Sequence, residues 1–300
     1  MKSLQSSTIG FIGAGKVGNA LGLYFYHSNL CIGGYYSLHT SSSQKSAHNT
    51  QSIVFQSISE CAQACDILFI TTPDGAIAEV WNDLKQVPLH GKIVCHTSGV
   101  MSSQIFDGIE KKGAIGYAIH PVVPITSDPN AYRSLYNAYF TVEGPDQHLE
   151  DLQLFFSHLG NSVVCIEAEK KHMYHAANVL LSSFLSVLIH TGWELLQECN
   201  IPLECAQKMT KPLIETTIQS VFDHGITDSL TGPVDRNDVV TIQRHLDCLP
   251  LEKQRLYAIL SSELVNIAQN KHPQNDYSSL KELFQTVLSS VQIAENEGLQ

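Results

Sequence analysis

Short apolar runs alternate with helical periodicity along the first half of the chain. An alternation of this kind predicts a parallel sheet with helices on both faces, the doubly wound α/β arrangement. The predicted strands cover 9–12, 30–36, 53–55, 66–71, 92–97, 114–119, 139–142 and 163–166, and the predicted helices between them include 58–64, 101–112 and 147–159.

The pattern changes near residue 168, after which no strand signal returns. Long helices are predicted over 169–198, 203–222, 236–247, 252–270 and 277–293. The change predicts two domains, 1–167 with the sheet and 168–300 all-helical, joined by the first long helix because no Pro/Gly-rich linker separates them.

A glycine-rich turn follows the first predicted strand and leads into a helix, and it consists of Gly13, Ala14, Gly15, Lys16, Val17 and Gly18. In a dinucleotide site the first glycine permits the tight turn, the second lets the backbone approach a pyrophosphate, and the third lets the helix pack on the strand. The helix N-terminus then offers N–H groups to the phosphates. Its position between strand and helix favours dinucleotide binding over a turn with a purely structural role.

The end of the second strand indicates which dinucleotide is bound. An NAD site usually has an acidic residue there, about 20 residues past the glycines, to hold the ribose 2′-hydroxyl. This chain has Ser37, His39 and Ser41, with Lys45 close behind, and no acid. These residues favour NADP over NAD, because they suit a 2′-phosphate; the alternative is a polar surface loop without a cofactor role.

Further candidates follow the later strands, at the edge where ligands bind in doubly wound sheets. Thr72 and Pro73 follow one strand, Ser98 another, and His120 ends a third. His120 is a candidate general acid/base or substrate ligand, or else anchors its loop. Asp74 after Pro73 is explained by helix capping.

The first long helix carries a narrow polar stripe. Lys171, His175, Asn178 and Ser182 recur at spacings of four, three and four residues, so they share one face of a helix that is otherwise apolar. The stripe either faces the cleft between the domains or is the solvent face. The run Val179–Ile189, interrupted by serines, is predicted to be a buried helix rather than a membrane span.

A Gly-Pro turn over residues 230–238 leads into the third helix of the second domain. Thr231 and Asp235 are candidate caps for that helix, and the guanidinium of Arg236 suits a carboxylate or phosphate on a substrate. The alternative for Arg236 is a surface pair with an aspartate.

Composition narrows the classes of partner. The net charge of −11 argues against nucleic acid and against an anionic membrane. The N-terminal residues show no signal peptide, and the eight cysteines form no CxxC pair, so structural thiols in a reducing cytoplasm are expected. His172 and His175 lack a third ligand at metal-site spacing, which makes a metal centre a minor alternative.

Several motifs together resemble one family. GFIGAGKVG, DILFITTPDGAI, CHTSG, HPVVPI, KKHMYHAAN and TGPVDRND occur in the order and spacing of the Rossmann-like proteins that carry domain of unknown function 2520. That family is similar to pyrroline-5-carboxylate reductases, deazaflavin-dependent NADP reductases and, more distantly, 3-hydroxyacid dehydrogenases. Two positions depart from its pattern: Ser37-Leu38-His39 stands where Ser-Arg-Ser is common, and Asn237 stands where glycine is usual.

The resemblance implies an NADP-binding Rossmann domain and a helical domain of the 6-phosphogluconate-dehydrogenase C-terminal type that forms a homodimer. It further implies an active site in the cleft between the domains. We therefore expect an NADP-dependent oxidoreductase that transfers hydride to or from a small, acidic carbonyl, imine or hydroxyl compound. His120 or His175 is the expected proton donor, with Lys171 assisting, and Asn178, Arg236 and Ser98 are expected to bind substrate. The alternative function is an NADP-binding sensor or interaction protein without catalysis.

Overall fold

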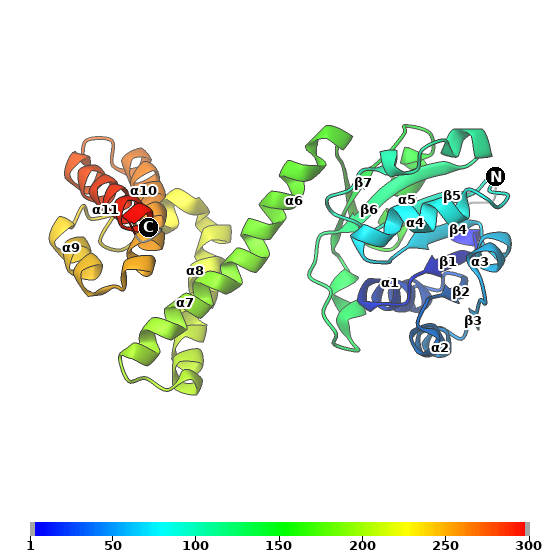
Figure 1. Ribbon diagram of the computed structural model, residues 1–300, viewed down its shortest axis with the longest axis horizontal. Helices are drawn as coiled ribbons and strands as arrows, with labels where there is room; N and C mark the ends of the chain where they lie inside the picture. Colours follow the sequence, from blue (N-terminus) through cyan, green and yellow to red (C-terminus); the bar gives the residue numbers. More distant parts are fainter. Residues whose placement is uncertain (1–3, 298–300) are drawn as a thin grey trace. The chain divides into compact units, whose positions relative to one another are not determined.

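A computed structural model describes residues 4–297. The chain forms two compact units, Met1–Leu188 and Ile189–Gln300 (Figure 1). The last strand ends at Cys165, and only helices follow it in the described residues, so strands give way to helices where the pattern indicates. The compact sheet unit nevertheless extends about 20 residues beyond this change, because the first turns of the long helix pack on the sheet. The functional boundary at 167/168 stays a prediction.

The first unit is built on one sheet of eight strands, and the predicted α/β class is confirmed. The strand order is β3-β2-β1-β4-β5-β6-β7-β8. Neighbouring strands are parallel except β6 and β7, which are antiparallel. The strands are β1 (Ile9–Ile12), β2 (Ile32–Tyr36), β3 (Ile53–Val54), β4 (Ile67–Ile70), β5 (Ile93–His96), β6 (Ile115–Pro121), β7 (Tyr139–Glu143) and β8 (Ser162–Cys165).

The antiparallel pair departs from the predicted all-parallel sheet. Parallel neighbours need a crossover connection, usually an α-helix. The connection from β6 to β7, residues 122–138, contains only the short 3-10 helix η4 (Ala131–Leu135), so β7 returns beside β6 in the opposite direction.

Helices cover both faces of the sheet and bury two separate cores. The helices are α1 (Lys16–His27), α2 (Thr40–Asn49), α3 (Ile58–Ala64), α4 (Asp74–Leu84) and α5 (Leu149–His158). Side chains from α1, α2 and α5 pack against one face of the strands, with residues such as Phe11 and Phe69. Side chains from α3 and α4 pack against the other face, with Ile12 and Leu68. Because side chains alternate along a strand, both faces of each inner strand are buried.

One local prediction was wrong, and one helix was missed. Residues 101–112 form two 3-10 turns, η2 (Ser103–Ile105) and η3 (Ile109–Lys112), rather than one helix. Gly108 between them has φ 75°, which an α-helix does not permit. Helix α2 was not predicted, because its sequence TSSSQKSAHN has no apolar stripe; its buried face consists of Ser43, Ser46 and Ala47.

The second unit is helical and has its own core. The long helix that leads into it comprises α6 (Lys171–Val179) and the π-helical segment η6 (Leu180–Phe184), both in the first compact unit, and α7 (Leu185–Glu198), which crosses the boundary. The helices α8 (Leu203–Ser229), α9 (Val239–Cys248), α10 (Leu251–Lys271) and α11 (Ser278–Glu297) follow. Helix α8 continues past the predicted end at 222 and has a kink at Gly225, where φ is 81°. The core of the unit lies mainly among α9, α10 and α11.

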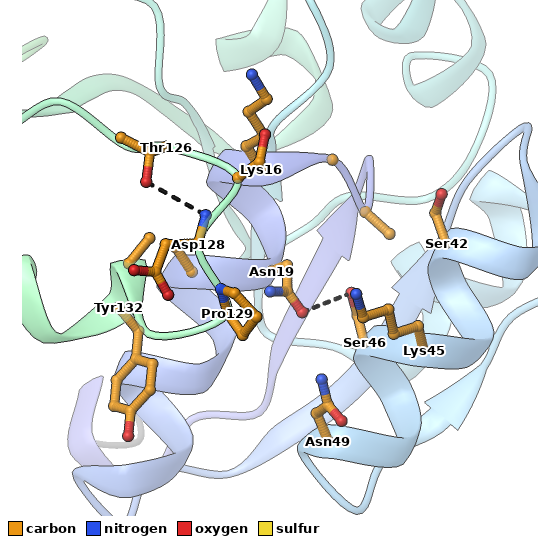
Figure 2. Close-up of a pocket in the computed structure, with 15 residues that line it drawn as sticks. Lys16, Asn19, Ser42, Lys45, Ser46, Asn49, Thr126, Asp128, Pro129 and Tyr132 are labelled. Atoms are coloured by element: carbon orange, nitrogen blue, oxygen red, sulfur yellow. Dashed lines mark hydrogen bonds between the residues drawn. The ribbon is translucent and has the colours of Figure 1, made fainter. Parts of the chain in front are cut away.

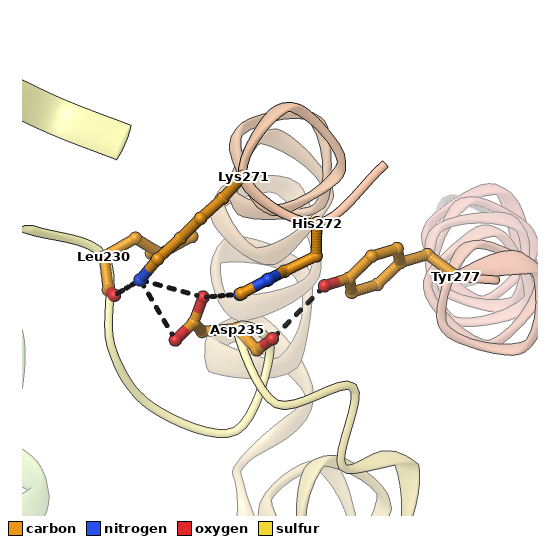
Figure 3. Close-up of polar contacts among 5 residues, drawn as sticks. All are labelled: Leu230, Asp235, Lys271, His272 and Tyr277. Carbon is orange, nitrogen blue, oxygen red and sulfur yellow. Dashed lines mark hydrogen bonds and ion pairs between the residues drawn. The ribbon is translucent and has the colours of Figure 1, made fainter. Parts of the chain in front are cut away.

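Polar contacts of Asp235 and Asp238 fix the loop before α9 and the start of that helix. Asp238, rather than Thr231 or Asp235, caps the helix: its carboxylate accepts a hydrogen bond from the backbone N–H of Thr241 at 3.0 Å. The Asp235 carboxylate instead lies 3.3 Å from Lys271 Nζ and 3.0 Å from His272 Nε2, as Figure 3 shows. Asn237 has φ 54°, a left-handed conformation that asparagine adopts more readily than most residues with a side chain, which is compatible with its place where the family's pattern has glycine.

The apolar part of the long helix is exposed, contrary to the prediction of a buried helix. Leu181 is 78% exposed and Phe184 is 52% exposed. Residues 168–198 are the one helix in the described part of the chain with the length and mean hydropathy of a membrane span. The serines that interrupt this run did not reduce its mean hydropathy below that of such a helix. An apolar composition alone does not distinguish burial within one chain from burial against a partner.

Candidate functional site

The glycine turn has the geometry of a phosphate-binding loop. Gly13 has φ 109°, and a side chain on Gly18 would overlap the carbonyl oxygen of Gly13. The Thr71 hydroxyl donates a hydrogen bond of 2.6 Å to that same oxygen and fixes the turn. By contrast, no atom lies within 4 Å of the point where a Gly15 side chain would begin. The backbone at Gly15, at the N-cap of α1, is therefore open to a ligand.

A pocket of about 210 Å³ borders this turn, between α1, α2 and the loop that precedes η4 (Figure 2). Asn19 and Ser46 form a hydrogen bond of 3.1 Å from one helix to the other. Lys16 and Lys45 supply positive charge to the lining, and Asp128 contributes one negative charge. The pocket thus joins the predicted Lys16 and Lys45 to the turn, while Ser37, His39 and Ser41 lie outside its lining.

The other predicted cofactor residues lie at the carboxyl ends of β2 and β4. Ser37 is half-buried just after β2, and His39 is the exposed N-cap of α2, where its side chain makes no capping bond. Thr72 and Pro73 lie between β4 and α4. The Thr72 hydroxyl is buried and has no hydrogen-bond partner among the described residues. An unpaired buried hydroxyl beside an open glycine turn fits a site that is completed by a bound polar group.

A second cluster lies at the ends of β5 and β6. Lys171 in the first turn of α6 is 1% exposed, and its Nζ donates a hydrogen bond of 3.0 Å to the carbonyl oxygen of Ser98. Burial lowers the pKa of Lys171 to about 8, although Glu143 and Asp74 act in the opposite direction. This amine therefore exchanges protons close to neutral pH.

His120 shares this cluster but stays neutral near pH 7. Burial, followed by the nearby Lys171 and His175, lowers the pKa of His120 to about 4. A side chain built on Gly99 would begin 3.0 Å from His120 Nε2 and 2.7 Å from His175 Cδ2, so both rings meet the Gly99 backbone. This lowered pKa makes His120 a weaker candidate for the predicted proton donor, and burial is the main cause.

Sequence reasoning missed three polar residues of this cluster, of which two lie beside His120 and the third, Glu143, acts on Lys171. The Tyr174 hydroxyl lies 2.7 Å from His120 Nδ1, and the Thr141 hydroxyl lies 3.1 Å from the Tyr174 hydroxyl. Glu143 is buried and accepts hydrogen bonds from the backbone N–H and hydroxyl of Ser103. Signals for all three existed: Tyr174 is on the same helix face as Lys171 and Asn178, and Thr141 and Glu143 are alternate polar positions in a buried strand.

His96 at the end of β5 and Ser98 just after it form hydrogen bonds with backbone groups of the turn that follows the strand. Burial lowers the pKa of His96 to about 4, and its ring lies 3.1 Å from the Ser102 carbonyl oxygen and 3.3 Å from the Ser98 nitrogen. The Ser98 hydroxyl accepts hydrogen bonds from the backbone N–H groups of Val100 and Met101. Ser98 thus presents its carbonyl to Lys171 while its side chain holds the turn.

The structure brings Lys171, His120, His175 and Ser98 together. Asn178 lies one turn further along α6 and donates to the backbone carbonyl of Tyr174 at 2.9 Å, and the exposed Ser182 donates to the carbonyl of Asn178. Arg236 is exposed in the second unit, and its predicted role stays a prediction. All eight cysteines are free thiols, and residues 4–297 contain no group of three His, Cys, Asp or Glu side chains that could hold a metal.

Comparisons with known proteins agree with this architecture. The chain is similar in structure to a candidate NADP oxidoreductase from Bacteroides fragilis, with 23% identity, a TM-score of 0.69, and coverage of 88% of this chain and 100% of that one. A reductive aminase from Aspergillus terreus in complex with NADPH has 12% identity, a TM-score of 0.60, and coverage of 98% and 95%. A Plasmodium falciparum pyrroline carboxylate reductase with NADP bound has 13% identity, a TM-score of 0.59, and coverage of 95% and 98%.

The sequence itself matches two family models. No curated protein matches the chain. A Rossmann-like domain model matches residues 3–121, and the model of domain of unknown function 2520 matches residues 138–264. The chain therefore consists of a Rossmann-like domain followed by a domain of unknown function 2520, which confirms the resemblance.

Proposed function

We propose that this protein is an NADP-dependent oxidoreductase that reduces a small carbonyl or imine compound or oxidises the corresponding alcohol or amine. The observation that carries the proposal is the buried amine of Lys171 beside the neutral His120, at the same sheet edge as the open glycine turn. A buried group that exchanges protons near neutral pH, next to a dinucleotide turn, suits the proton transfer that accompanies hydride transfer. Structural neighbours with NADP or NADPH bound support this cofactor.

The residues at the sheet edge have separable tasks. Bound NADPH supplies the hydride. Gly13, Gly15 and Gly18 leave room for the pyrophosphate, and the Thr72 hydroxyl is free to accept a cofactor hydrogen bond. Lys171 Nζ holds the proton that the substrate oxygen or nitrogen receives, while its bond to the Ser98 carbonyl fixes its position. His120 Nε2 donates a hydrogen bond to the same substrate atom. Asn178, Arg236 and Ser98 stay predicted substrate ligands, and His175 stays the other candidate proton donor.

The cofactor preference is tested by titration with NADPH and NADH, followed by nicotinamide fluorescence. We expect tight NADPH binding and weak NADH binding. In Ser37→Asp a carboxylate at the end of β2 repels the 2′-phosphate, so NADPH binding weakens by about 10-fold or more while NADH binding is retained or improves. Ser41→Asp, in the first turn of α2, provides a second position for comparison. Preference of the wild type for NADH would overturn the choice of NADP.

The activity is tested by NADPH oxidation against a panel of small keto acids, ketones and cyclic imines. Turnover of any of them supports the enzyme, and faster turnover of acidic compounds supports a carboxylate-binding role of Arg236. Tight NADPH binding without turnover of any panel member would favour the alternative, a protein that senses NADP without catalysis.

We further propose that the exposed apolar segment Leu180–Leu188 binds a second copy of this chain. The first turns of α6 already contact the sheet unit, through the hydrogen bonds of Lys171 and Tyr174. This contact favours a protein partner over lipid for the rest of the helix. Adjacent exposed apolar side chains such as Leu181 and Phe184 are typical of protein interaction sites. A cytoplasmic location likewise stays a prediction, and the free thiols support it.

The dimer is tested with Leu181→Glu/Phe184→Glu. Charges placed in an apolar interface are expected to shift the protein from dimer to monomer at micromolar concentration, measured by light scattering after gel filtration. Leu154→Glu is the matched control, because Leu154 is 57% exposed on α5 in the sheet unit. A wild-type monomer, or a dimer unaffected by the double substitution, would contradict the proposal.

A further inference from the structure

The hydroxyl groups of Thr141 and Tyr174 form a hydrogen-bonded chain that ends at Nδ1 of His120. The Thr141 hydroxyl lies 3.1 Å from the Tyr174 hydroxyl, and the Tyr174 hydroxyl lies 2.7 Å from His120 Nδ1. Thr141 is 5% exposed, and Tyr174 and His120 are partly buried. The three residues come from β7, α6 and β6, and His120 and Thr141 are direct cross-strand partners. The contact therefore depends on the sheet ladder rather than on a loop.

The direction of these hydrogen bonds follows from the donors available. The Thr141 hydroxyl has two acceptors in reach, the Tyr174 oxygen at 3.1 Å and the His120 carbonyl oxygen at 3.5 Å, and the shorter contact assigns its hydrogen to Tyr174. With that oxygen acting as an acceptor, the Tyr174 hydrogen is free to point at His120. Burial raises the pKa of Tyr174, so the hydroxyl keeps its proton at neutral pH, although hydrogen bonds from the Thr141 and Asn178 side chains act in the opposite direction. Tyr174 thus donates and His120 Nδ1 accepts.

A neutral imidazole has one N–H, so an accepting Nδ1 requires the hydrogen to be on Nε2. In residues 4–297 no hydrogen-bond partner of Nε2 is found, and this atom faces the backbone of Gly99, where the absence of a side chain leaves space. The Nε2–H group is consequently a donor directed at the position where the proposed substrate binds, next to the amine of Lys171.

We propose that Tyr174 and Thr141 are positioning residues that hold His120 as the neutral Nε2–H tautomer, so that it serves as a hydrogen-bond donor rather than as the proton donor. The inference rests on the proposed function in one respect: the group that receives the hydrogen bond is the carbonyl oxygen or imine nitrogen of the substrate. The tautomer itself does not depend on the activity and can be measured without substrate.

The test is the tautomer of His120, measured by ¹⁵N NMR of the imidazole nitrogens in the full-length protein, with the signal assigned through His120→Gln. The wild type is expected to show protonated Nε2 and unprotonated Nδ1 at pH 7. Tyr174→Phe removes the donor, so a mixture with the Nδ1–H tautomer is expected. Thr141→Val is expected to shift the populations in the same direction, and Thr141→Ser, which keeps the hydroxyl, is expected to restore the wild-type pattern.

Kinetics provide the second readout. In Tyr174→Phe we expect kcat to fall by about 10- to 100-fold, corresponding to about 1.4 to 2.8 kcal/mol, with the NADPH affinity unchanged. Tyr139→Phe, an exposed tyrosine on β7, is the control for loss of a hydroxyl. An Nδ1–H tautomer in the wild type, or an unchanged Nε2–H tautomer in Tyr174→Phe, would overturn the inference whatever the activity shows. The expected tautomers in a protein that turns over no substrate would support the positioning role and contradict the proposed function alone.

Discussion

Replacing Lys171 by methionine is expected to lower kcat by about 100- to 10,000-fold, the range for removal of a general acid. Methionine keeps much of the volume of the buried side chain, so the loss reports on the amine rather than on packing. NADPH affinity should stay within about twofold of the wild type, because the bonds of Lys171 are to the Ser98 carbonyl and not to the glycine turn. Steady-state kinetics with a substrate from the panel and a fluorescence titration measure the two quantities.

The pH dependence of kcat in the wild type is a second way to identify Lys171 as the proton donor. The protonated amine is the form that delivers a proton, and its pKa is lowered to about 8 mainly by burial. For reduction, kcat is therefore expected to be constant at lower pH and to fall about tenfold per unit as the pH rises above about 8. Lys171→Met should lose this dependence. Lys170→Met, at the exposed neighbouring lysine, serves as the matched control and should retain it. A profile with the same fall in Lys171→Met would assign the proton to another residue.

Alanine substitutions at Gly15 and Gly18, only three residues apart, are expected to affect different properties: NADPH binding at Gly15 and stability at Gly18. Gly18→Ala forces a side chain against the backbone oxygen of Gly13, which no rotamer change relieves, so it should destabilise the protein by about 1 to 3 kcal/mol and lower the Tm. Gly15→Ala meets no protein atom within 4 Å and should fold normally. Its methyl group nevertheless occupies the approach of the pyrophosphate, so NADPH should bind about 10- to 100-fold more weakly.

Thermal unfolding and NADPH titration of the two variants separate these effects. Gly75→Ala is a suitable control, because the space beside Gly75 is also open and it lies outside the glycine turn. Wild-type NADPH affinity in Gly15→Ala would mean that the turn is a structural feature and not a phosphate site.

The elements that the sequence predicts well are those with a clear period. The apolar strands Ile9–Ile12 and Ile67–Ile70 are buried along their whole length and were predicted within a residue or two. Helix α2 was missed because its buried face is formed by serines and an alanine. The antiparallel direction of β7 was missed because strand patterns carry no information on direction, which depends here on a connection without a crossover helix.

In the candidate site, too, the sequence predicts what is local and misses what depends on segments distant in the chain. The glycine turn is local, so its residues are adjacent in the sequence and were found together. Lys171 and His120 were found because each is a chemically distinctive residue in an apolar context. Their different titration was not predictable, since the pKa of each depends on burial by segments distant in the sequence. The role of Tyr174 was equally hidden, because its hydroxyl meets His120 only after a strand and a helix far apart in the chain come together.

The antiparallel pairing of β6 and β7 makes the site sensitive to strand register. His120 is opposite Thr141, and Ala118 is opposite Glu143, so both polar residues of β7 lie on one face of the sheet. A slip of a single residue would turn Thr141 and Glu143 toward the opposite core and bring Phe140 and Val142 to the face that bears the chemistry. Such a slip would bury the Glu143 carboxylate among apolar side chains and remove the Thr141 hydroxyl from the side of His120. The register of β6 and β7 therefore links the packing of the sheet to the hydrogen bonds around His120.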